Sequence, residues 1–561
     1  MLKLNRVLSP VFETSADSVR RREPLILLAV LLFAVILRLP VIMRNPIPAG
    51  DGVTSNLEVA VNLRDRYGFS TMRKWTLYSE SMDELRPEGN RQPVMILLIY
   101  VLFLVTGPGF TAAQILSLFA GLICLFMCWL WARRNFGKLP ALFTLLVLSV
   151  TPLFIWYSTQ PDSLMLFTAL FFAILLVADR KILSFKIVIL LGILTGLAYL
   201  TRTQGMLLAF SIGFWVLLRG GVKRILKTLL FITVFILTCM PWFMRNLSAF
   251  GSPTYTQGGQ FLLNENHWAA WEVRDTPPEP LDMLRHQGAG AVGAYLAKGT
   301  LRVLEPITTG SLHRGENFGQ PSLVGFAILA LLVLRSRDLR RKMILPAIAS
   351  IPPMVMLVLH EHSSRYLTFF IVIVAGLGSA GLLSLIKLAG KRTATVAGVL
   401  LLLPFLYPLG SVLSEISVER AAEAEEISRW LEENSENGNW VVTYPNVGLL
   451  IWQYRRPTLT MPNDYEMLLW PCLEEHGVRY VVVDNYLPVF RPHLQHRWRR
   501  TPDGSCWQLI NPPEFLMEVY RSESGKSIVY EMTEPVPEGY MHTDSLPRDN
   551  MRALSPAGIP W

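Results

Sequence analysis

Long apolar runs separated by short polar connections occupy the first 413 residues of this 561-residue chain. A helix needs about 20 apolar residues to cross the hydrocarbon core of a bilayer. The first run, 24–43, is followed by no small-x-small cleavage site, so we interpret it as an uncleaved first span. The pattern predicts a polytopic α-helical membrane protein with twelve candidate spans, at residues 24–43, 93–106, 111–131, 139–157, 163–178, 186–201, 205–218, 226–245, 321–335, 343–360, 366–387 and 394–413.

The basic residues of the connections predict which side of the membrane each one faces. Loops rich in Lys and Arg stay in the cytoplasm. The basic loops alternate with the others if 93–106, only 14 residues long, is re-entrant or interfacial. Eleven spans then remain, and we predict about 11–13. If 93–106 does cross, either a further crossing is hidden or the charge rule fails for most loops. The N-terminus is predicted to be cytoplasmic, as are the basic connections 133–138, 179–186, 219–224, 335–342 and 387–392.

The composition changes after residue 413. The tail 414–561 contains 13 Lys/Arg and 22 Asp/Glu, a net charge of −9. Because the whole chain has a net charge of +9, residues 1–413 carry a net charge of +18. An acidic tail on a basic membrane body is not the pattern of a nucleic-acid-binding protein. We therefore predict two domains: a transmembrane domain, 1–413, with outer loops 44–92 and 246–320, and an extracytoplasmic domain, 414–561.

The tail alternates helical and strand patterns, which predicts a small α/β domain. An acidic segment with an apolar stripe, 414–434, predicts a helix. "WVVTY" and "RYVVVD" predict buried strands, with a helix between them in which Pro471 causes a bend or a break. Cys472 and Cys506 are candidates for a disulfide if this domain lies outside the cytoplasm.

Several charged residues stand at the predicted outer ends of spans, where Lys and Arg should be scarce. A charged side chain at the centre of a membrane helix costs about 2.5–3.5 kcal/mol, and less near the ends. Guanidinium groups match the oxygens of a phosphate, and a carboxylate can accept a proton from an attacking hydroxyl. The pattern favours one outer cavity that holds an anionic lipid head group beside a base, formed by Asp51, Arg91, Asp162, Arg202, Arg245 and Arg365.

Simpler interpretations of the same residues remain open. An arginine at the end of a span often extends its charge to the membrane surface. Asp162, which follows a proline, is equally suited to cap a helix. His267 in "NENHWAAW" fits a surface loop, and tryptophans nearby fit interfacial anchors as well as sugar-stacking platforms. The interpretation as a site therefore depends on the shared side of the membrane rather than on any single residue.

Six segments resemble those of a known family in order and in predicted side. They are "GDGVTSNLEVAVNLRDRYGF", "NRQPVMILLIY", "STQPDSLMLFTALFF", "LAYLTRTQGMLL", "PWFMRNLSAFGSP" and "EHSSRYLTFF". The chain resembles a GT-C fold glycosyltransferase of the protein mannosyltransferase type (family 39), which includes bacterial aminoarabinose transferases that modify lipid A. Asp51-Gly52 stands where the family often has Asp-Glu, and Arg91 stands where aminoarabinose transferases have Lys.

The resemblance implies a lipid-linked sugar donor, a polyprenyl phosphate, and an inverting transfer to an acceptor lipid, glycan or protein of the cell envelope. It implies a location in the cytoplasmic membrane. Metal dependence varies in the superfamily, and the sequence has no cluster of metal ligands. The implied catalytic residues are Asp51, the base, and Asp162; the implied substrate-binding residues are Arg91, Arg202, Arg245, Asn246, His267, Arg365 and Tyr366.

Two functions from other classes remain as alternatives. A transporter or flippase of a lipid-linked substrate would place charges near the membrane midplane and often contains inverted repeats. The sequence has few intramembrane acids and no detectable repeat. A non-catalytic membrane scaffold is the second alternative, because Gly52 replaces an acid of the family pattern.

Overall fold

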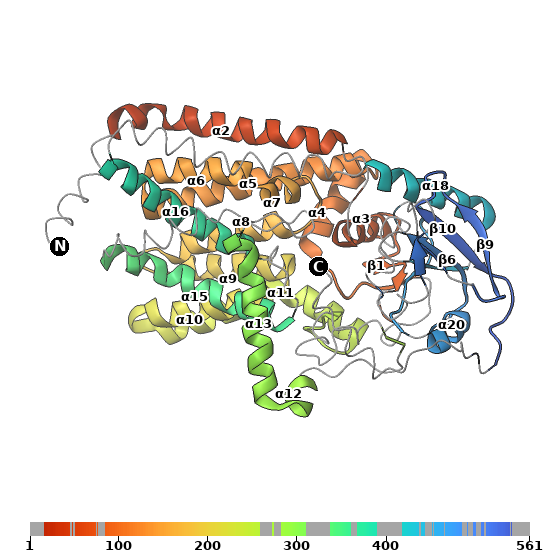
Figure 1. Ribbon diagram of the computed structural model, residues 1–561. Coiled ribbons are helices and arrows are strands. Elements are labelled where there is room, and N and C mark those ends of the chain that lie inside the picture. The colour runs from red at the N-terminus through yellow and green to blue at the C-terminus, as the bar shows by residue number, and fades with distance from the viewer. Residues whose placement is uncertain are drawn as a thin grey trace.

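The computed structural model describes most of the chain, drawn as coloured ribbon in Figure 1. At residues 16–22, 51, 282, 302–309, 337–340, 356–357, 359–360, 384–389, 418–422, 484, 498–500 and 507 it describes only the backbone. The described residues are 16–44, 48, 51–74, 76, 85–257, 272–273, 282–309, 337–360, 367–389, 418–436, 439–443, 452, 454–464, 466–484, 491, 498–500, 507–509, 512–538 and 540.

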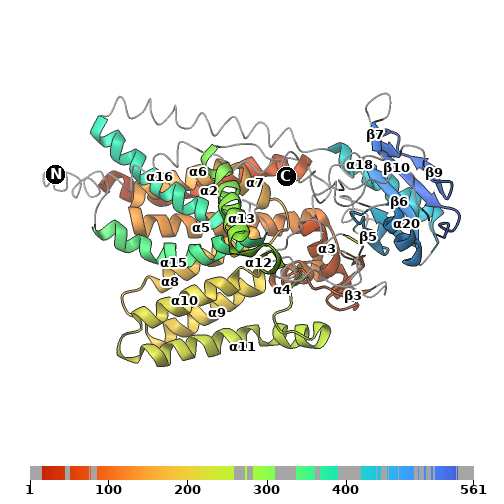
Figure 2. The same cartoon turned by 60° about the horizontal axis from the view of Figure 1, so that its bottom comes forward.

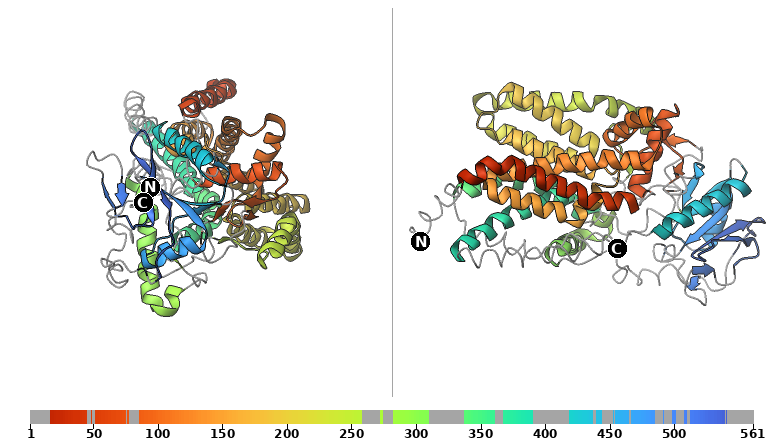
Figure 3. Two further views of the ribbon diagram at one scale, coloured as in Figure 1. Left: turned by 90° about the vertical axis from the view of Figure 1, so that its right-hand side faces the viewer. Right: turned by 90° about the horizontal axis from the view of Figure 1, so that it is seen from above.

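Apolar helices that run side by side form the larger part of the molecule (Figure 1 and Figure 3, right). Three of the described helices are long and apolar enough to cross a membrane, at Glu23–Arg44, Phe110–Phe136 and Gly221–Phe250, and shorter apolar helices lie beside them. The helices are α2 (Ala16–Arg44), α5 (Phe110–Phe136), α6 (Lys138–Val150), α7 (Pro152–Tyr157), α8 (Leu164–Ala178), α9 (Phe185–Thr201), α10 (Gly205–Arg219), α11 (Arg224–Phe250), α13 (Gly288–Thr309), α15 (Arg337–His360) and α16 (Thr368–Ala389), with the short α12 (Asp282–His286) and the 3-10 turn η2 (Gly221–Lys223).

The helix bounds match some predicted spans and correct another. Helix α4 (Pro93–Thr106) has the bounds predicted for the short run. The run 139–157 is not one helix, because Thr151 is extended and Pro152, which lacks an amide hydrogen, begins α7. Runs 321–335 and 394–413 lie outside the described residues, so the number of spans stays a prediction.

Polar contacts join the basic connections at one end of the bundle. Arg133 and Lys138 both form ion pairs with the buried Glu23, at 2.6 and 3.2 Å. Arg134 forms an ion pair with Asp179 at 3.2 Å across two connections. The start of the first span and the connections 133–138 and 179–186 therefore share one end of the molecule, and the assignment of that end to the cytoplasm stays a prediction.

The opposite end of the bundle carries the first outer loop. Its helix α3 (Asp51–Arg64) packs on α4 through a buried cluster that includes Val53, Leu57, Ile96 and Ile99. Positions 53, 57 and 60 are apolar at helical spacing and face α4, but residues 53–62 are all buried, polar ones included, so α3 is enclosed on every side. The strands β1 (Ser70–Thr71) and β3 (Arg86–Pro87) pair antiparallel beyond it. Figure 2 shows α3 and α4 between the bundle and the C-terminal domain.

The C-terminal domain is built on a six-stranded sheet, as the α/β pattern predicted. Helices α18 (Val418–Asn434) and α20 (Glu466–Glu475) pack on opposite faces, because alternate residues of β4 and β6 contact each helix. Pro471 lies inside α20, so the predicted break is absent there. The sheet has the order β2 (Arg73–Lys74), β5 (Thr458–Thr460), β4 (Trp440–Thr443), β6 (Val478–Asp484), β10 (Ser527–Met532), β9 (Leu516–Arg521), and a separate pair joins β7 (Trp498–Arg500) to β8 (Trp507–Leu509).

One strand of this sheet comes from the first outer loop. Arg73 and Lys74 form β2, which pairs parallel with β5 at the edge of the sheet. The sequence did not predict this strand, since two residues are too few to show an alternating pattern. The division at residue 413 stays a prediction, and the sheet extends across it.

Candidate active site

The N-terminus of α3 meets two other chain segments at Gly52. A β-carbon built on Gly52 would lie 3.2 Å from Asp162 Oδ2 and 3.4 Å from Arg91 Nη1. Asp162 belongs to the loop between α7 and α8, and Arg91 directly precedes α4. The structure thus brings together three segments that the sequence assigned to one outer cavity.

Hydrogen bonds hold Asp162 in place from two sides. Its Oδ1 accepts from the backbone amide of Leu164, the first residue of α8, at 2.8 Å, while the N-cap position itself is Ser163. Arg202 approaches the same oxygen with Nη1 at 3.4 Å and donates to Ser163 Oγ at 3.1 Å. The side chains of Asp162 and Arg202 are 17% and 16% exposed. Oδ2 faces α3, so Asp162 both accepts from the first amide of α8 and lines the site.

Helix α3 is anchored to the same loop. Asn56 Nδ2 donates to the carbonyl of Pro161 at 2.9 Å, one turn along α3 from Gly52. The apolar face of α3 packs on α4 at the same time. These contacts fix the start of α3, and with it the backbone of Asp51, beside Asp162. The side chain of Asp51 lies outside the described part of the structure.

A carboxylate shapes the turn that carries Arg91. Glu88 Oε1 accepts from the backbone amides of Asn90, at 2.5 Å, and Arg91, at 3.0 Å. Helix α4 then begins at Pro93, where the missing amide hydrogen has no effect on the helix. Among the described residues, Arg91 Nε is buried without a hydrogen-bond acceptor. The turn directs the guanidinium group to Gly52.

Arg245 and Asn246 lie in a separate set of contacts. The Arg245 guanidinium carbon lies 4.9–5.2 Å from the ring centroids of Trp242, Phe250 and Phe69. Arg245 Nη2 also donates to the carbonyl of Phe69 at 3.0 Å. Asn246 accepts from Arg245 at 3.0 Å. In the described part of the chain no contact joins either residue to Asp162, and their binding role stays a prediction.

Three predicted site residues, His267, Arg365 and Tyr366, lie outside the described residues. Conversely, the structure shows a buried carboxylate that the sequence did not suggest. Glu58 on α3 accepts from Thr71 Oγ1 at 2.9 Å and from the amide of Met72 at 2.5 Å. Burial raises the pKa of Glu58 from 4.5 to about 7, and the nearby Glu88 carboxylate adds to the increase. A single Glu in an amphipathic helix gives no sequence signal for such a role.

The described residues contain no group of three or more His, Cys, Asp or Glu side chains that could hold a metal ion. Cys472 is buried on α20, and its predicted partner Cys506 lies outside the described residues. The described part of the site therefore consists of carboxylate, guanidinium and backbone groups. Such groups suit the binding of an oxyanion and the transfer of a proton.

Comparison with known proteins agrees with this chemistry. Residues 90–248 match the family described as dolichyl-phosphate-mannose-protein mannosyltransferase. No curated protein matches the chain. The matched range contains Arg91, Asp162, Arg202 and Arg245.

Solved structures show the same fold at low sequence identity. The archaeal oligosaccharyltransferase AglB from Archaeoglobus fulgidus, in complex with an inhibitory peptide and a dolichol-phosphate, has a TM-score of 0.55 at 13% identity; the match covers 88% of this chain and 75% of that chain. ArnT from Cupriavidus metallidurans bound to undecaprenyl phosphate has a TM-score of 0.53 at 13% identity, covering 92% and 99%. Its apo state has a TM-score of 0.54 at 14% identity, covering 93% and 99%.

The family match and the fold agree on one class of protein. The chain has the GT-C fold of membrane glycosyltransferases, and its residues 90–248 match a glycosyltransferase family. The resemblance seen in the sequence is thereby confirmed for fold and enzyme class. The donor, the acceptor and the roles of individual residues are matters for proposal.

Proposed function

We propose that the protein transfers a sugar from a polyprenyl-phosphate donor to an acceptor outside the cytoplasm. The observation that carries this proposal is the meeting of α3 with Arg91 and Asp162 at Gly52, with Arg202 next to Asp162. Two cationic forks and a carboxylate at the end of an apolar bundle suit a phosphate carried by a lipid. AglB with dolichol-phosphate and ArnT with undecaprenyl phosphate support the choice of donor.

In the proposed reaction the acceptor hydroxyl or amine attacks the anomeric carbon of the sugar. The bond from this carbon to the phosphate oxygen breaks, and the polyprenyl phosphate leaves with inversion at the carbon. Asp51 accepts the proton of the attacking group, and Arg91 and Arg202 stabilise the charge that develops on the phosphate. Asp162 orients Arg202 through the 3.4 Å contact.

We propose that the acceptor is a lipid, glycan or protein of the cell envelope. The similar structures do not narrow this choice, because one is an oligosaccharyltransferase with a bound peptide and the other is ArnT. In the proposed orientation the end of the bundle that carries α3 and the C-terminal domain faces outward from the cytoplasmic membrane. Arg245, Asn246, His267, Arg365 and Tyr366 are proposed as further substrate contacts, following the family pattern.

The first test is a comparison of three variants in lipid nanodiscs. Asp51→Asn should reduce transfer by at least about 1000-fold and leave binding of undecaprenyl phosphate unchanged, because only the base is lost. Arg91→Ala should weaken that binding by about 10- to 100-fold, the equivalent of a charged hydrogen bond. Arg479→Ala, which removes an exposed ion pair with Glu531 in the C-terminal domain, serves as the control and should change neither quantity.

Mass spectrometry of the lipids that co-purify with the protein identifies the donor for this assay. Full transfer activity in Asp51→Asn would refute the proposed base. Movement of a lipid-linked substrate across the membrane without any glycosyl product would favour a flippase. Failure to bind any polyprenyl phosphate would favour a non-catalytic scaffold.

A further inference from the structure

A short segment of the C-terminal domain, residues 452–460, contacts the first outer loop at several points. The Trp452 side chain packs on the apolar cluster shared by α3 and α4. Arg455 forms an ion pair with Asp65, directly after α3. The strand β5 pairs with β2, and the amide of Thr458 donates to the carbonyl of Met72 at 3.2 Å. The C-terminal domain therefore holds the loop by packing, charge and backbone hydrogen bonds together.

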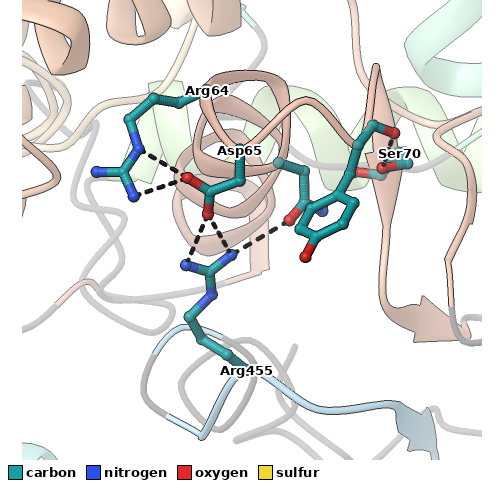
Figure 4. Close-up of polar contacts among 6 residues, drawn as sticks. Arg64, Asp65, Ser70 and Arg455 are labelled. Carbon is teal, nitrogen blue, oxygen red and sulfur yellow. Dashed lines mark hydrogen bonds and ion pairs between the residues drawn. The ribbon is translucent and has the colours of Figure 1, made fainter.

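Asp65 lies between two guanidinium groups (Figure 4). Arg64 approaches Oδ1 with Nε at 2.9 Å, and Arg455 approaches Oδ2 with both Nη1 and Nη2, at 3.3 and 3.2 Å. Arg455 Nη2 also lies 3.5 Å from Asn62 Oδ1 on α3. Because both amino groups of Arg455 take part, its contact fixes direction as well as distance.

Arg455 is itself held firmly within the C-terminal domain. Tyr454 on one side of it hydrogen-bonds to Ser435 Oγ, and Arg456 on the other side donates to the Ser435 carbonyl at 3.2 Å. Arg455 has a positive φ of 52°, which a non-glycine residue rarely adopts. The backbone thus accepts an unfavourable conformation that directs the side chain to Asp65.

From this geometry we propose that Arg455 is a positioning residue for transfer, acting through Asp65 and α3. Helix α3 has 14 residues and therefore spans about 20 Å. Arg455 holds the region just beyond its C-terminus, and Asp51 begins the helix at the other end. Asn56 and the packing on α4 hold the N-terminal part of α3, and Arg455 adds a restraint at the C-terminal end. Arg91, Asp162 and Arg202 stand on other elements, so α3 loosened at its C-terminal end would shift the base relative to the donor site. This inference depends on the function proposed above.

The expected signature is a loss of turnover without a loss of donor binding. A displacement of about 1 Å in a catalytic group can cost about 100-fold in rate. The Arg455–Asp65 pair is partly exposed, with side chains 39% and 25% exposed, so its loss should leave the protein folded. We expect Arg455→Ala and Asp65→Ala each to lower kcat by about 5- to 20-fold, with the dissociation constant for undecaprenyl phosphate unchanged.

A double-mutant cycle tests whether Arg455 acts through Asp65. The variant with both substitutions should lose no more kcat than either single variant, because the same contact is already absent. Arg455→Lys keeps the charge but not the two-pronged contact, and should recover only part of kcat. Arg479→Ala, an arginine of β6 paired with Glu531 and away from α3, is the matched control and should retain full kcat.

Hydrogen exchange of residues 51–64 gives a readout that does not depend on activity. Exchange in α3 should be faster in Arg455→Ala than in Arg479→Ala, with the bundle helices unchanged. Unchanged kcat and unchanged exchange in Arg455→Ala would overturn the inference even if the wild-type protein is an active transferase. A wild-type protein without transferase activity would instead refute the proposed function. Faster exchange of α3 in Arg455→Ala would still show that Arg455 restrains α3 through Asp65.

Discussion

Gly52 permits the sharpest test of the site, because it has no side chain where two charged groups approach α3. In Gly52→Ala the new β-carbon would lie 3.2 Å from Asp162 Oδ2 and 3.4 Å from Arg91 Nη1. The first distance is shorter than an ordinary contact, so the carboxylate must move by a few tenths of an ångström. Gly52→Glu adds a second carboxylate. At a separation of about 4 Å and an effective dielectric constant near 20, this carboxylate is repelled by Asp162 by about 4 kcal/mol and is attracted by Arg91 by a similar amount, so it competes for Arg91.

Activity and stability should respond in opposite directions. Gly52 lies in the helix and has no positive φ, so alanine fits its backbone. Alanine stabilises a helix by about 0.5–1 kcal/mol relative to glycine. We expect Gly52→Ala to keep or raise the melting temperature, yet to lower kcat by about 3- to 10-fold. Gly52→Glu should lower kcat by about 100-fold or more, since it also displaces Asp162 or Arg91.

The assay measures kcat and the dissociation constant for undecaprenyl phosphate for both variants and for Gly52→Gln. Glutamine has nearly the same size as glutamate but no charge, so the difference between these two variants separates the effect of the added charge from steric displacement. Wild-type kcat in Gly52→Glu would refute the interpretation that the space at Gly52 belongs to Asp162 and Arg91. It would also show that the site tolerates the acid common in the family.

Two further predictions concern buried groups around the site. Since the folded-state pKa of Glu58, about 7, lies above its ordinary value of 4.5, its contribution to stability is fully present below pH 4.5 and is lost as the pH rises to about 7, by about 3 kcal/mol. Thermal unfolding from pH 4.5 to 8 should therefore show a shallower decline for Glu58→Gln; parallel profiles would contradict the assigned cause. Arg245→Lys should destabilise the protein by about 1–2 kcal/mol, because lysine cannot stack on three rings. Arg219→Lys, with only one described ring contact, should cost less in the same measurement.

The sequence predicted well those features that depend on local pattern and on charge. The apolar run 93–106 has clear end signals, Pro93 and Gly107, and the helix has these bounds. The prediction that acids and arginines meet holds for Asp162 with Arg91 and Arg202, because each stands at the end of a helix on the same side of the bundle. Charge marks such positions as candidates, since its cost in the membrane is high.

Features that depend on contacts between distant segments were not predictable. Arg245 has the same sequence signature as Arg202, but the aromatic side chains around it come from α11 and from Phe69, so it is enclosed by rings. The break at Thr151-Pro152 was missed because both halves are apolar. Glu58 became a buried carboxylate through residues Thr71 and Met72, beyond the helix.

The placement of β2 at the edge of the C-terminal sheet has a consequence for biogenesis. Arg73 and Lys74 are synthesised long before their partners Thr458 and Leu459 on β5. Until β5 is made, β2 has no strand to join and its edge is open to unwanted pairing. Final assembly of the loop that carries α3 must therefore wait for synthesis of β5, so a chain that stops before β5 would have an unfinished surface at this end of the bundle.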